Sequence, residues 1–182
     1  MPEPKTYYNP VNGEYTKILE SAADTNGEYS HLEVCLKPGG GNPPHYHKKF
    51  TEEFFAVKGL LGLQYEKEDL HLQPGENRLV SIGTVHRFFN DTDEEIIFRI
   101  ILRKGQPGFE NFIKSLFGLV NDGKTTKRQT PKNPLYAALL LKWGDTHLKN
   151  PFFYLLTPFA GMAYFLAKVT GADTRLKNRY CR

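Results

Sequence analysis

The sequence predicts a mainly β protein, a sandwich or barrel of short strands that is followed by a helical extension. Two observations support this prediction. Between residues 15 and 110, short runs rich in β-branched and aromatic residues alternate with turns that contain glycine, proline or asparagine. From Phe109 onward, apolar residues recur at spacings of three and four, which is typical of helices.

Eight runs are the expected strands, and turn signals separate them. The turn signals lie at residues 24–28, 37–41, 59, 73–77 and 82–84. Many short strands at regular spacing favour closure into a sandwich or a barrel. The runs are YTKILES, EYSHLEVCL, EEFFAVKG, LLGLQYE, DLHL, NRLVSI, HRFFN and EEIIFRIILR.

Three helices are expected in the extension. The first is GFENFIKSLFGLV, and Gly123 is placed to end it. A polar loop, NDGKTTKRQTPKNP, precedes two further candidates, PLYAALLLKW and NPFFYLLTPFAGMAYFLAKV, the second of which we expect to be interrupted at Pro158. We therefore expect a β-barrel domain with an N-terminal arm over residues 1–108. Residues 109–182 should form a helical extension that packs on the barrel or on a second subunit.

Charge divides the chain in the same way. A chain of 182 residues with 40% hydrophobic residues is long enough to bury one core. Through Glu110 it has 12 Lys and Arg against 17 Asp and Glu, and after Glu110 it has 12 against 3, so the two parts carry −5 and +9. This opposition favours docking of the extension on its own barrel or on a neighbour's.

The composition also limits where the protein acts and what it binds. The N-terminus has no apolar run, and Cys35 and Cys181 lie far apart, so we expect a cytoplasmic location. Residues 151–167 carry no charge, but a bilayer span needs about 20 apolar residues and this run contains Pro158 and Gly161. Membrane association is therefore not expected, and peripheral contact through the basic face is a better reading than a span. Nucleic acid is not an expected partner, since KTTKRQTPK is one short basic loop without aromatic residues.

Two histidines one residue apart indicate a metal site. In an extended strand, His45 and His47 project from the same face, and imidazole binds transition metals at about 2.0–2.1 Å. Glu52 lies an odd number of residues beyond His47, so an unbroken strand would turn its carboxylate to the other face. The chain must therefore bend over residues 48–51 if Glu52 is to join the two imidazoles.

The spacing around these residues resembles the first motif of the cupin superfamily. The motif begins at Gly39, continues through His45 and His47, and reaches Glu52 and Gly59. Six residues separate Glu52 from Gly59, and this spacing selects Glu52 rather than the adjacent glutamate.

The second cupin motif follows between Gly75 and Asn90 and contains His86. Ser81 stands where the family usually has proline, a change that loosens the turn but removes no ligand. The resemblance covers residues 28–103. It is strongest to single-domain conserved-barrel and quercetin-dioxygenase-like members of the superfamily.

The resemblance implies a cupin jelly-roll barrel of two antiparallel sheets with the helical extension attached. It also implies one divalent transition-metal ion, and the ligand types do not choose among Fe, Mn, Ni, Co, Cu and Zn. Cupins often dimerise through their sheets, so a homodimer is expected. The implied metal ligands are His45, His47, Glu52 and His86.

Two functions remain open. The first is a small metal-dependent enzyme of dioxygenase, isomerase or lyase type, acting on a small oxygen-rich molecule as its ligand. The alternative is a non-catalytic metal- or ligand-binding module whose helical tail contacts a partner or a membrane surface. No catalytic residue and no organic cofactor site is predicted, because strand alternation turns Glu53, the nearest candidate base, away from the ligands.

We expect structural roles for most of the remaining candidate residues. His31, His71 and His147 are expected to be surface or packed residues. Asn90 is expected to support the turn and strand after His86 or to orient a ligand. Three aromatic residues could line a pocket around the ion, although core packing explains each of them equally well: Phe54, Tyr65 and Phe88.

Overall fold

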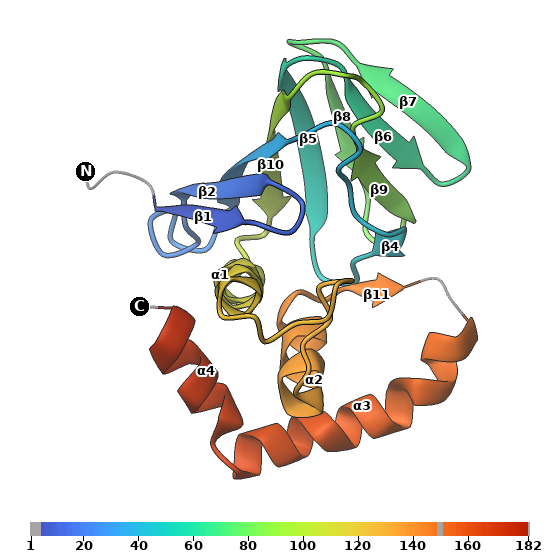
Figure 1. Ribbon diagram of the computed structural model, residues 1–182. Helices are drawn as coiled ribbons and strands as arrows, with labels where there is room; N and C mark the ends of the chain where they lie inside the picture. The colour runs from blue at the N-terminus through green and yellow to red at the C-terminus, as the bar shows by residue number, and fades with distance from the viewer. Residues whose placement is uncertain (1–4, 149–150, 182) are drawn as a thin grey trace.

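The protein is a two-sheet β-barrel that stands on a layer of helices (Figure 1). The computed structural model describes residues 5–148 and 151–181, with side chains for 5–148 and 159–181. One sheet has the strand order β1 (Thr6–Asn9), β2 (Glu14–Glu20), β3 (Ser30–Leu36), β10 (Ile96–Arg103), β5 (Thr51–Lys58) and β8 (Asn77–Val80). The other has the order β11 (His147–Leu148), β4 (His45–Tyr46), β9 (His86–Phe89), β6 (Leu61–Tyr65) and β7 (Glu68–Leu72). All paired strands are antiparallel, so the predicted jelly-roll architecture is confirmed.

Strict alternation builds the barrel core. In β10, buried and more exposed residues alternate along the whole strand, as expected for a strand with one face toward the core. The inward residues of β10 meet those of β3, β5 and β6, and together they form one apolar cluster. Its fully buried members include Leu32, Phe54, Leu63, Phe98 and Leu102.

Four helices follow the barrel within the described residues: α1 (Pro107–Asn121), α2 (Pro134–Trp143), α3 (Pro151–Val169) and α4 (Ala172–Tyr180). Proline opens both α1 and α2, where its missing N–H leaves no hydrogen bond unmade. Gly123 has φ +65° just after α1, as predicted for a helix stop. A second apolar cluster, built around Leu119, Leu139 and Leu176, joins the helices.

One expectation about the extension was wrong, and one helix had not been predicted. Helix α3 runs through Pro158 without interruption, because loss of one N–H donor leaves the other hydrogen bonds of the helix available. Helix α4 was not predicted at all, since ADTRLKNRY is polar and has few apolar residues to reveal a periodicity. The FFYLL side chains lie outside the described residues. Within the part of the chain that the structure describes, no helix combines the length and apolarity needed to cross a bilayer.

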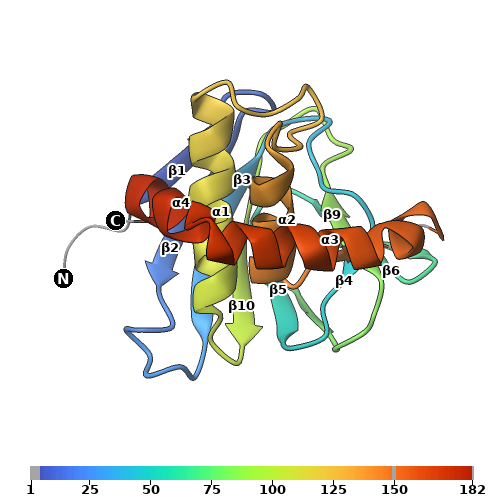
Figure 2. The ribbon, with the colours of Figure 1, turned by 90° about the horizontal axis from the view of Figure 1, so that it is seen from below.

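Helix α1 connects the barrel to the other helices. Phe109 and Ile113 belong to the barrel core, whereas Leu119, further along α1, belongs to the helical cluster. Viewed from below, α1 and α2 lie between the barrel and α3 (Figure 2). The division into a barrel domain of residues 1–108 and an extension of residues 109–182 stays a prediction. Because α1 contributes to both apolar clusters, the boundary between the two parts should be tested at this helix.

A buried carboxylate fixes the start of α1. Glu110 is 5% exposed, and its Oε1 accepts hydrogen bonds from Ala22 N and from Ser30 Oγ, both at 2.7 Å. Ser30 Oγ also accepts a hydrogen bond from Gln106 N at 2.9 Å. Glu110 lies in the first turn of α1, where a negative charge also interacts favourably with the helix dipole.

Replacement of Glu110 by alanine should therefore destabilise the protein. The change leaves two buried donors, Ala22 N–H and Ser30 O–H, without their acceptor, which costs about 2 kcal/mol of unfolding free energy. Urea denaturation measures this loss. The control is Glu28→Ala, in an exposed turn, which should change stability little. Equal stability of the two variants would show that this contact does not hold α1 to the barrel.

Candidate metal centre

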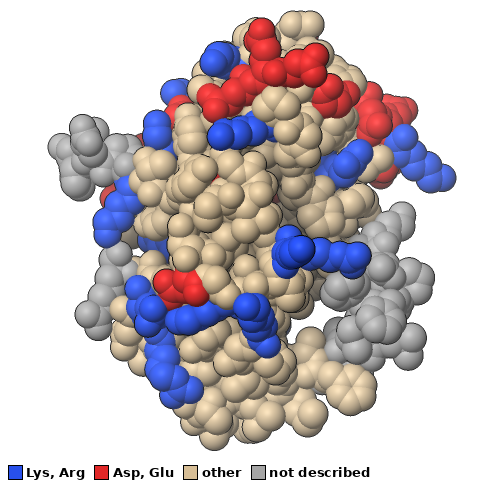
Figure 3. Space-filling view, in the orientation of Figure 1, with Lys and Arg blue, Asp and Glu red and all other residues tan. Residues whose placement is uncertain are grey.

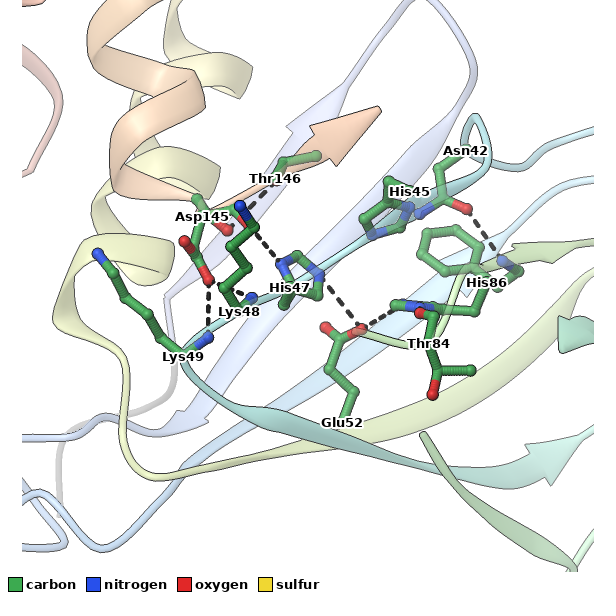
Figure 4. Close-up of polar contacts among 12 residues, drawn as sticks. Asn42, His45, His47, Lys48, Lys49, Glu52, Thr84, His86, Asp145 and Thr146 are labelled. Atoms are coloured by element: carbon green, nitrogen blue, oxygen red, sulfur yellow. Dashed lines mark hydrogen bonds and ion pairs between the residues drawn. The ribbon is translucent and has the colours of Figure 1, made fainter. Parts of the chain in front are cut away.

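The four predicted ligands converge inside the barrel (Figure 4). One ligand atom from each lies within 4.8 Å of the others, and exposures range from 1% for His86 to 8% for His45. Direct pairing of β4 with β9 places His45 opposite His86. The bend required between His47 and Glu52 is present at Lys48 and Lys49. The structure thus brings together the residues that the sequence singled out.

Main-chain carbonyl groups set the orientation of all three imidazoles. A carbonyl oxygen only accepts hydrogen bonds, so each Nδ1 must carry the proton. In a neutral ring the Nε2 lone pair is then free to bind a metal ion. The three contacts are His45 Nδ1 with Pro43 O at 2.9 Å, His47 Nδ1 with Asp145 O at 3.0 Å, and His86 Nδ1 with Thr84 O at 3.0 Å.

The contacts of Glu52 test whether these residues suit a cation. Glu52 Oε2 lies 2.6 Å from His86 Nε2 and 3.5 Å from His47 Nε2. A carboxylate and an imidazole lone pair are both acceptors, so they repel at such distances unless a proton or a cation lies between them. His47 Nε2 is also buried without a hydrogen-bond partner, which is costly for a polar atom. Three imidazole nitrogens and one carboxylate fit a divalent transition metal.

The protonation states of the cluster follow from burial and proximity. Burial, together with the neighbouring His86 and His47 rings, lowers the pKa of His45 to about 3, so this imidazole is neutral at pH 7. Burial raises the pKa of Glu52, but the nearby charge of His47 and the contacts of the carboxylate with His47 and His86 outweigh it and hold the pKa below its usual value. Burial lowers the pKa of His47, but the Glu52 carboxylate outweighs this and raises it. Neutral imidazole and ionised carboxylate are the forms that bind metals.

Asp145 is a contributor that the sequence did not reveal. It lies between α2 and β11, 98 residues beyond His47, and its carbonyl oxygen receives the His47 Nδ1 hydrogen bond. Its side-chain Oδ2 accepts hydrogen bonds from Lys48 N at 2.7 Å and Lys49 N at 2.9 Å. Asp145 therefore holds both the His47 ring and the bend that follows it. A single aspartate after a helix gives no signal for this role.

The same segment of the extension adds a strand to the barrel. In β11, His147 pairs with Tyr46 and Leu148 pairs with His45. The His147 and Tyr46 rings stack with centroids 5.1 Å apart, and His147 Nε2 lies 3.2 Å from Asp145 Oδ1. His147 is thus a packed residue, as expected, and it lies beside the cluster without joining it.

The other sequence candidates have structural roles. The Asn90 amide donates to Leu36 O at 3.0 Å and Glu94 O at 2.7 Å, so it supports the turn after β9. The Phe54 and His86 ring centroids are 5.9 Å apart. Glu53 pairs across the sheet with Ile101 on β10, on the face opposite Glu52. His31 and His71 form pairs elsewhere, with Glu20 and Asp91 respectively.

Aromatic packing and a surface depression flank the cluster. The Phe50 ring stacks on His47 with centroids 4.3 Å apart, and Phe109 of α1 meets the same imidazole edge-on at 5.9 Å. Two further residues lie next to ligands of the cluster. Tyr65 is the strand partner of His86, and Gly83 N donates a hydrogen bond to His47 O at 2.8 Å. Both residues line a depression of about 590 Å³, with Glu66, Lys67, Glu68, Arg78 and Val85.

Comparison with known proteins agrees with this architecture. A family model described as Cupin domain matches residues 32–102. The oxidoreductase OpS7 of Beauveria bassiana (strain ARSEF 2860) is 31% identical over 85 residues, which cover 43% of this chain and 28% of that protein. Quercetin 2,3-dioxygenase of Bacillus subtilis (strain 168) is 25% identical over 101 residues, which cover 55% of this chain and 29% of that protein. The match thus spans less than a third of either relative.

A solved structure shows the same fold. It is a sugar phosphate isomerase of the cupin superfamily from Silicibacter pomeroyi DSS-3, with a TM-score of 0.50 and 19% identity. The alignment covers 57% of this chain and 73% of that one. At this identity the likeness concerns the fold alone.

Asp145→Asn should destabilise the bend beside His47. Asparagine has nearly the same shape and tolerates the positive φ of +47° at this position, but it replaces two charge-assisted hydrogen bonds with neutral ones. The expected loss is about 1 kcal/mol of unfolding free energy, with faster amide exchange at Lys48 and Lys49. Asp93→Asn, at an exposed position, is the control. Unchanged exchange in Asp145→Asn would show that the carboxylate does not hold the bend.

Proposed function

Because the barrel of this chain belongs to the cupin superfamily, we propose that the protein is a metal-binding cupin and that its buried cluster holds one divalent transition-metal ion. One observation carries the proposal: one nitrogen from each of three imidazoles and one carboxylate oxygen, all within 4.8 Å, in a cluster whose Nδ1 atoms are tied to carbonyl groups. The ligands of the proposal are His45, His47, Glu52 and His86.

The identity of the ion is left open by the ligand types. Imidazole and carboxylate accept Fe, Mn, Ni, Co, Cu and Zn, and selection among them depends on geometry and availability. When bound, such an ion supplies Lewis-acid polarisation of a substrate oxygen or, if it is redox-active, oxygen chemistry.

The residues of this chain would orient the ligands and exclude water. Pro43, Thr84 and Asp145 fix the three imidazoles through their carbonyl groups. Phe50 and Phe109 cover the His47 side. The proposed approach for a small molecule is the depression beside Tyr65, the strand partner of His86. We infer that this molecule is small and oxygen-rich and that the reaction is of dioxygenase, isomerase or lyase type. The names of the fungal and Bacillus relatives support oxidation.

A non-catalytic binding module is the second candidate. The observation that favours it is the lack, among the described residues, of another carboxylate in hydrogen-bond contact with the cluster. Glu53 lies on the opposite face of β5 and cannot serve as a base there. Turnover of oxygen-rich substrates by metal-loaded protein separates the two candidates: an enzyme changes the substrate, whereas a module only binds it.

A homodimer through the barrel sheets is part of the proposal. Val57 of β5 and Leu79 of β8 are 41% and 50% exposed; β8 is the edge strand of the six-stranded sheet and β5 lies beside it. Apolar residues on the outer face of a sheet are suited to pairing with a second copy. Analytical ultracentrifugation of the wild type and of Leu79→Ser tests this interface.

The metal content of protein purified without an affinity tag tests the central assignment. Mass spectrometry should find about one transition-metal ion per chain. His86→Ala should lose this ion, because removal of one imidazole leaves only three of the four protein ligands. His71→Ala, which removes an imidazole at the surface, should retain the metal. Absence of metal from the wild type even after reconstitution with each candidate ion would refute the site.

The double variant His45→Ala/His47→Ala should lose metal and remain folded. Neither histidine belongs to the apolar cluster between the sheets. Burial of apolar surface supplies most of the folding free energy, so the barrel should fold without the two imidazoles. Circular dichroism and gel filtration measure the outcome. An insoluble double variant beside a soluble Glu52→Gln protein would indicate that the histidines act in folding rather than in metal binding.

A further inference from the structure

Helix α3 carries a row of exposed apolar side chains, which we call the α3 stripe. Their exposed fractions run from 44% for Leu166 to 68% for Val169. Spacings of three and four place them on one side of the helix. Contiguous apolar surface of this kind is uncommon on soluble monomers and marks sites of interaction. The α3 stripe consists of Phe159, Met162, Phe165, Leu166 and Val169.

The packing of α3 fixes the direction in which the stripe faces. On the opposite side of the helix, Ala167 is fully buried in the cluster that contains Leu139 of α2 and Leu176 of α4. Figure 2 shows α3 lying across the base of the molecule, with α1 and α2 between it and the barrel. The sequence led us to expect the extension to pack on the barrel or on a second subunit. The stripe lies on the side of α3 that faces away from the barrel.

Basic side chains flank the stripe. Lys168 directly precedes Val169, and Arg175 Nη1 donates to Thr170 O at 2.8 Å, which holds the guanidinium beside the C-terminal end of α3. Lys142 Nζ lies 6.0 Å from the ring centroid of Tyr164 on α3.

The carboxylates of the extension are engaged. Residues 111–182 contain three of them. Asp122 pairs with Arg179 at 2.6 Å, Asp145 accepts from Lys48 N and Lys49 N, and Asp173 pairs with Lys168 and Lys177. The base of the protein therefore presents positive charge around an apolar row.

The two ends of the molecule differ in charge. In Figure 3, acidic side chains gather over the barrel at the top of the view, whereas basic side chains lie above a largely uncharged surface at the base. This division agrees with the charges of −5 and +9 for residues 1–110 and 111–182. A negatively charged surface would attract the base and repel the far end of the barrel.

We propose that the α3 stripe docks the protein on the surface of a bilayer that contains anionic lipids. The stripe inserts at the boundary between headgroups and acyl chains, the flanking cations contact lipid phosphates, and the acidic barrel points away. From Phe159 to Val169 the helix extends about 15 Å, so it lies along the surface and does not cross. A second copy seated on the same stripe would bring together two extensions that each carry a net charge of +9, which disfavours self-association there.

Co-sedimentation of the full chain with vesicles tests this docking surface. The wild type should bind vesicles of phosphatidylcholine mixed with phosphatidylglycerol, bind phosphatidylcholine alone weakly, and dissociate as salt is raised. Phe165→Ser/Val169→Ser should lower the partition coefficient at least about tenfold, because two apolar side chains no longer insert. The matched control Val11→Ser/Ile82→Ser removes two apolar side chains of 52% and 53% exposure from barrel loops and should bind like the wild type.

Three results would overturn the proposal. The first is no binding of the wild type to the mixed vesicles at low salt. The second is equal loss of binding in the stripe variant and the control variant. The third is self-association of the wild type in lipid-free ultracentrifugation that the stripe variant abolishes, since a second copy would then cover α3. Circular dichroism confirms that each variant is folded, and the metal centre plays no part in any readout.

Discussion

The structure depends on one constraint, which is that a carboxylate and three imidazoles are buried together in an apolar barrel. Polar atoms withdrawn from water must find partners, or the fold loses several kcal/mol for each ionised group. Here the outward nitrogens bond to carbonyl oxygens of the main chain, and the inward nitrogens and Glu52 face one another. The inward set is left with an excess of acceptors. A proton or a cation between these atoms would resolve that excess, and the proposed metal ion is one such cation.

The helical extension contributes to the site as well as covering the barrel. Glu110 ties α1 to the loop before β3, Phe109 covers one side of His47, and Asp145 supplies the carbonyl that orients the same imidazole. Strand β11 then continues the sheet beside β4. Helices α2, α3 and α4 share a core of their own beneath the barrel.

Much of the barrel and its cluster could be predicted, because both depend on local spacing. Alternation along β5 separates Glu52 from Glu53, and the interval of one residue puts His45 and His47 in reach of the same point. Asp145 could not be predicted, since its contact with His47 spans 98 residues and needs only a carbonyl, which every residue has. The outward direction of the α3 stripe was also hidden, because periodicity identifies an apolar face without saying what covers it.

X-ray absorption at the metal edge tests the central claim most directly, because it reports the atoms that surround the ion rather than its presence alone. The account predicts a spectrum that fits three imidazole nitrogens and one carboxylate oxygen at about 2.0–2.2 Å in the wild type, and loss of the metal edge in His86→Ala. A metal surrounded only by oxygen, or an unchanged spectrum in His86→Ala, would contradict it and place the ion elsewhere on the protein.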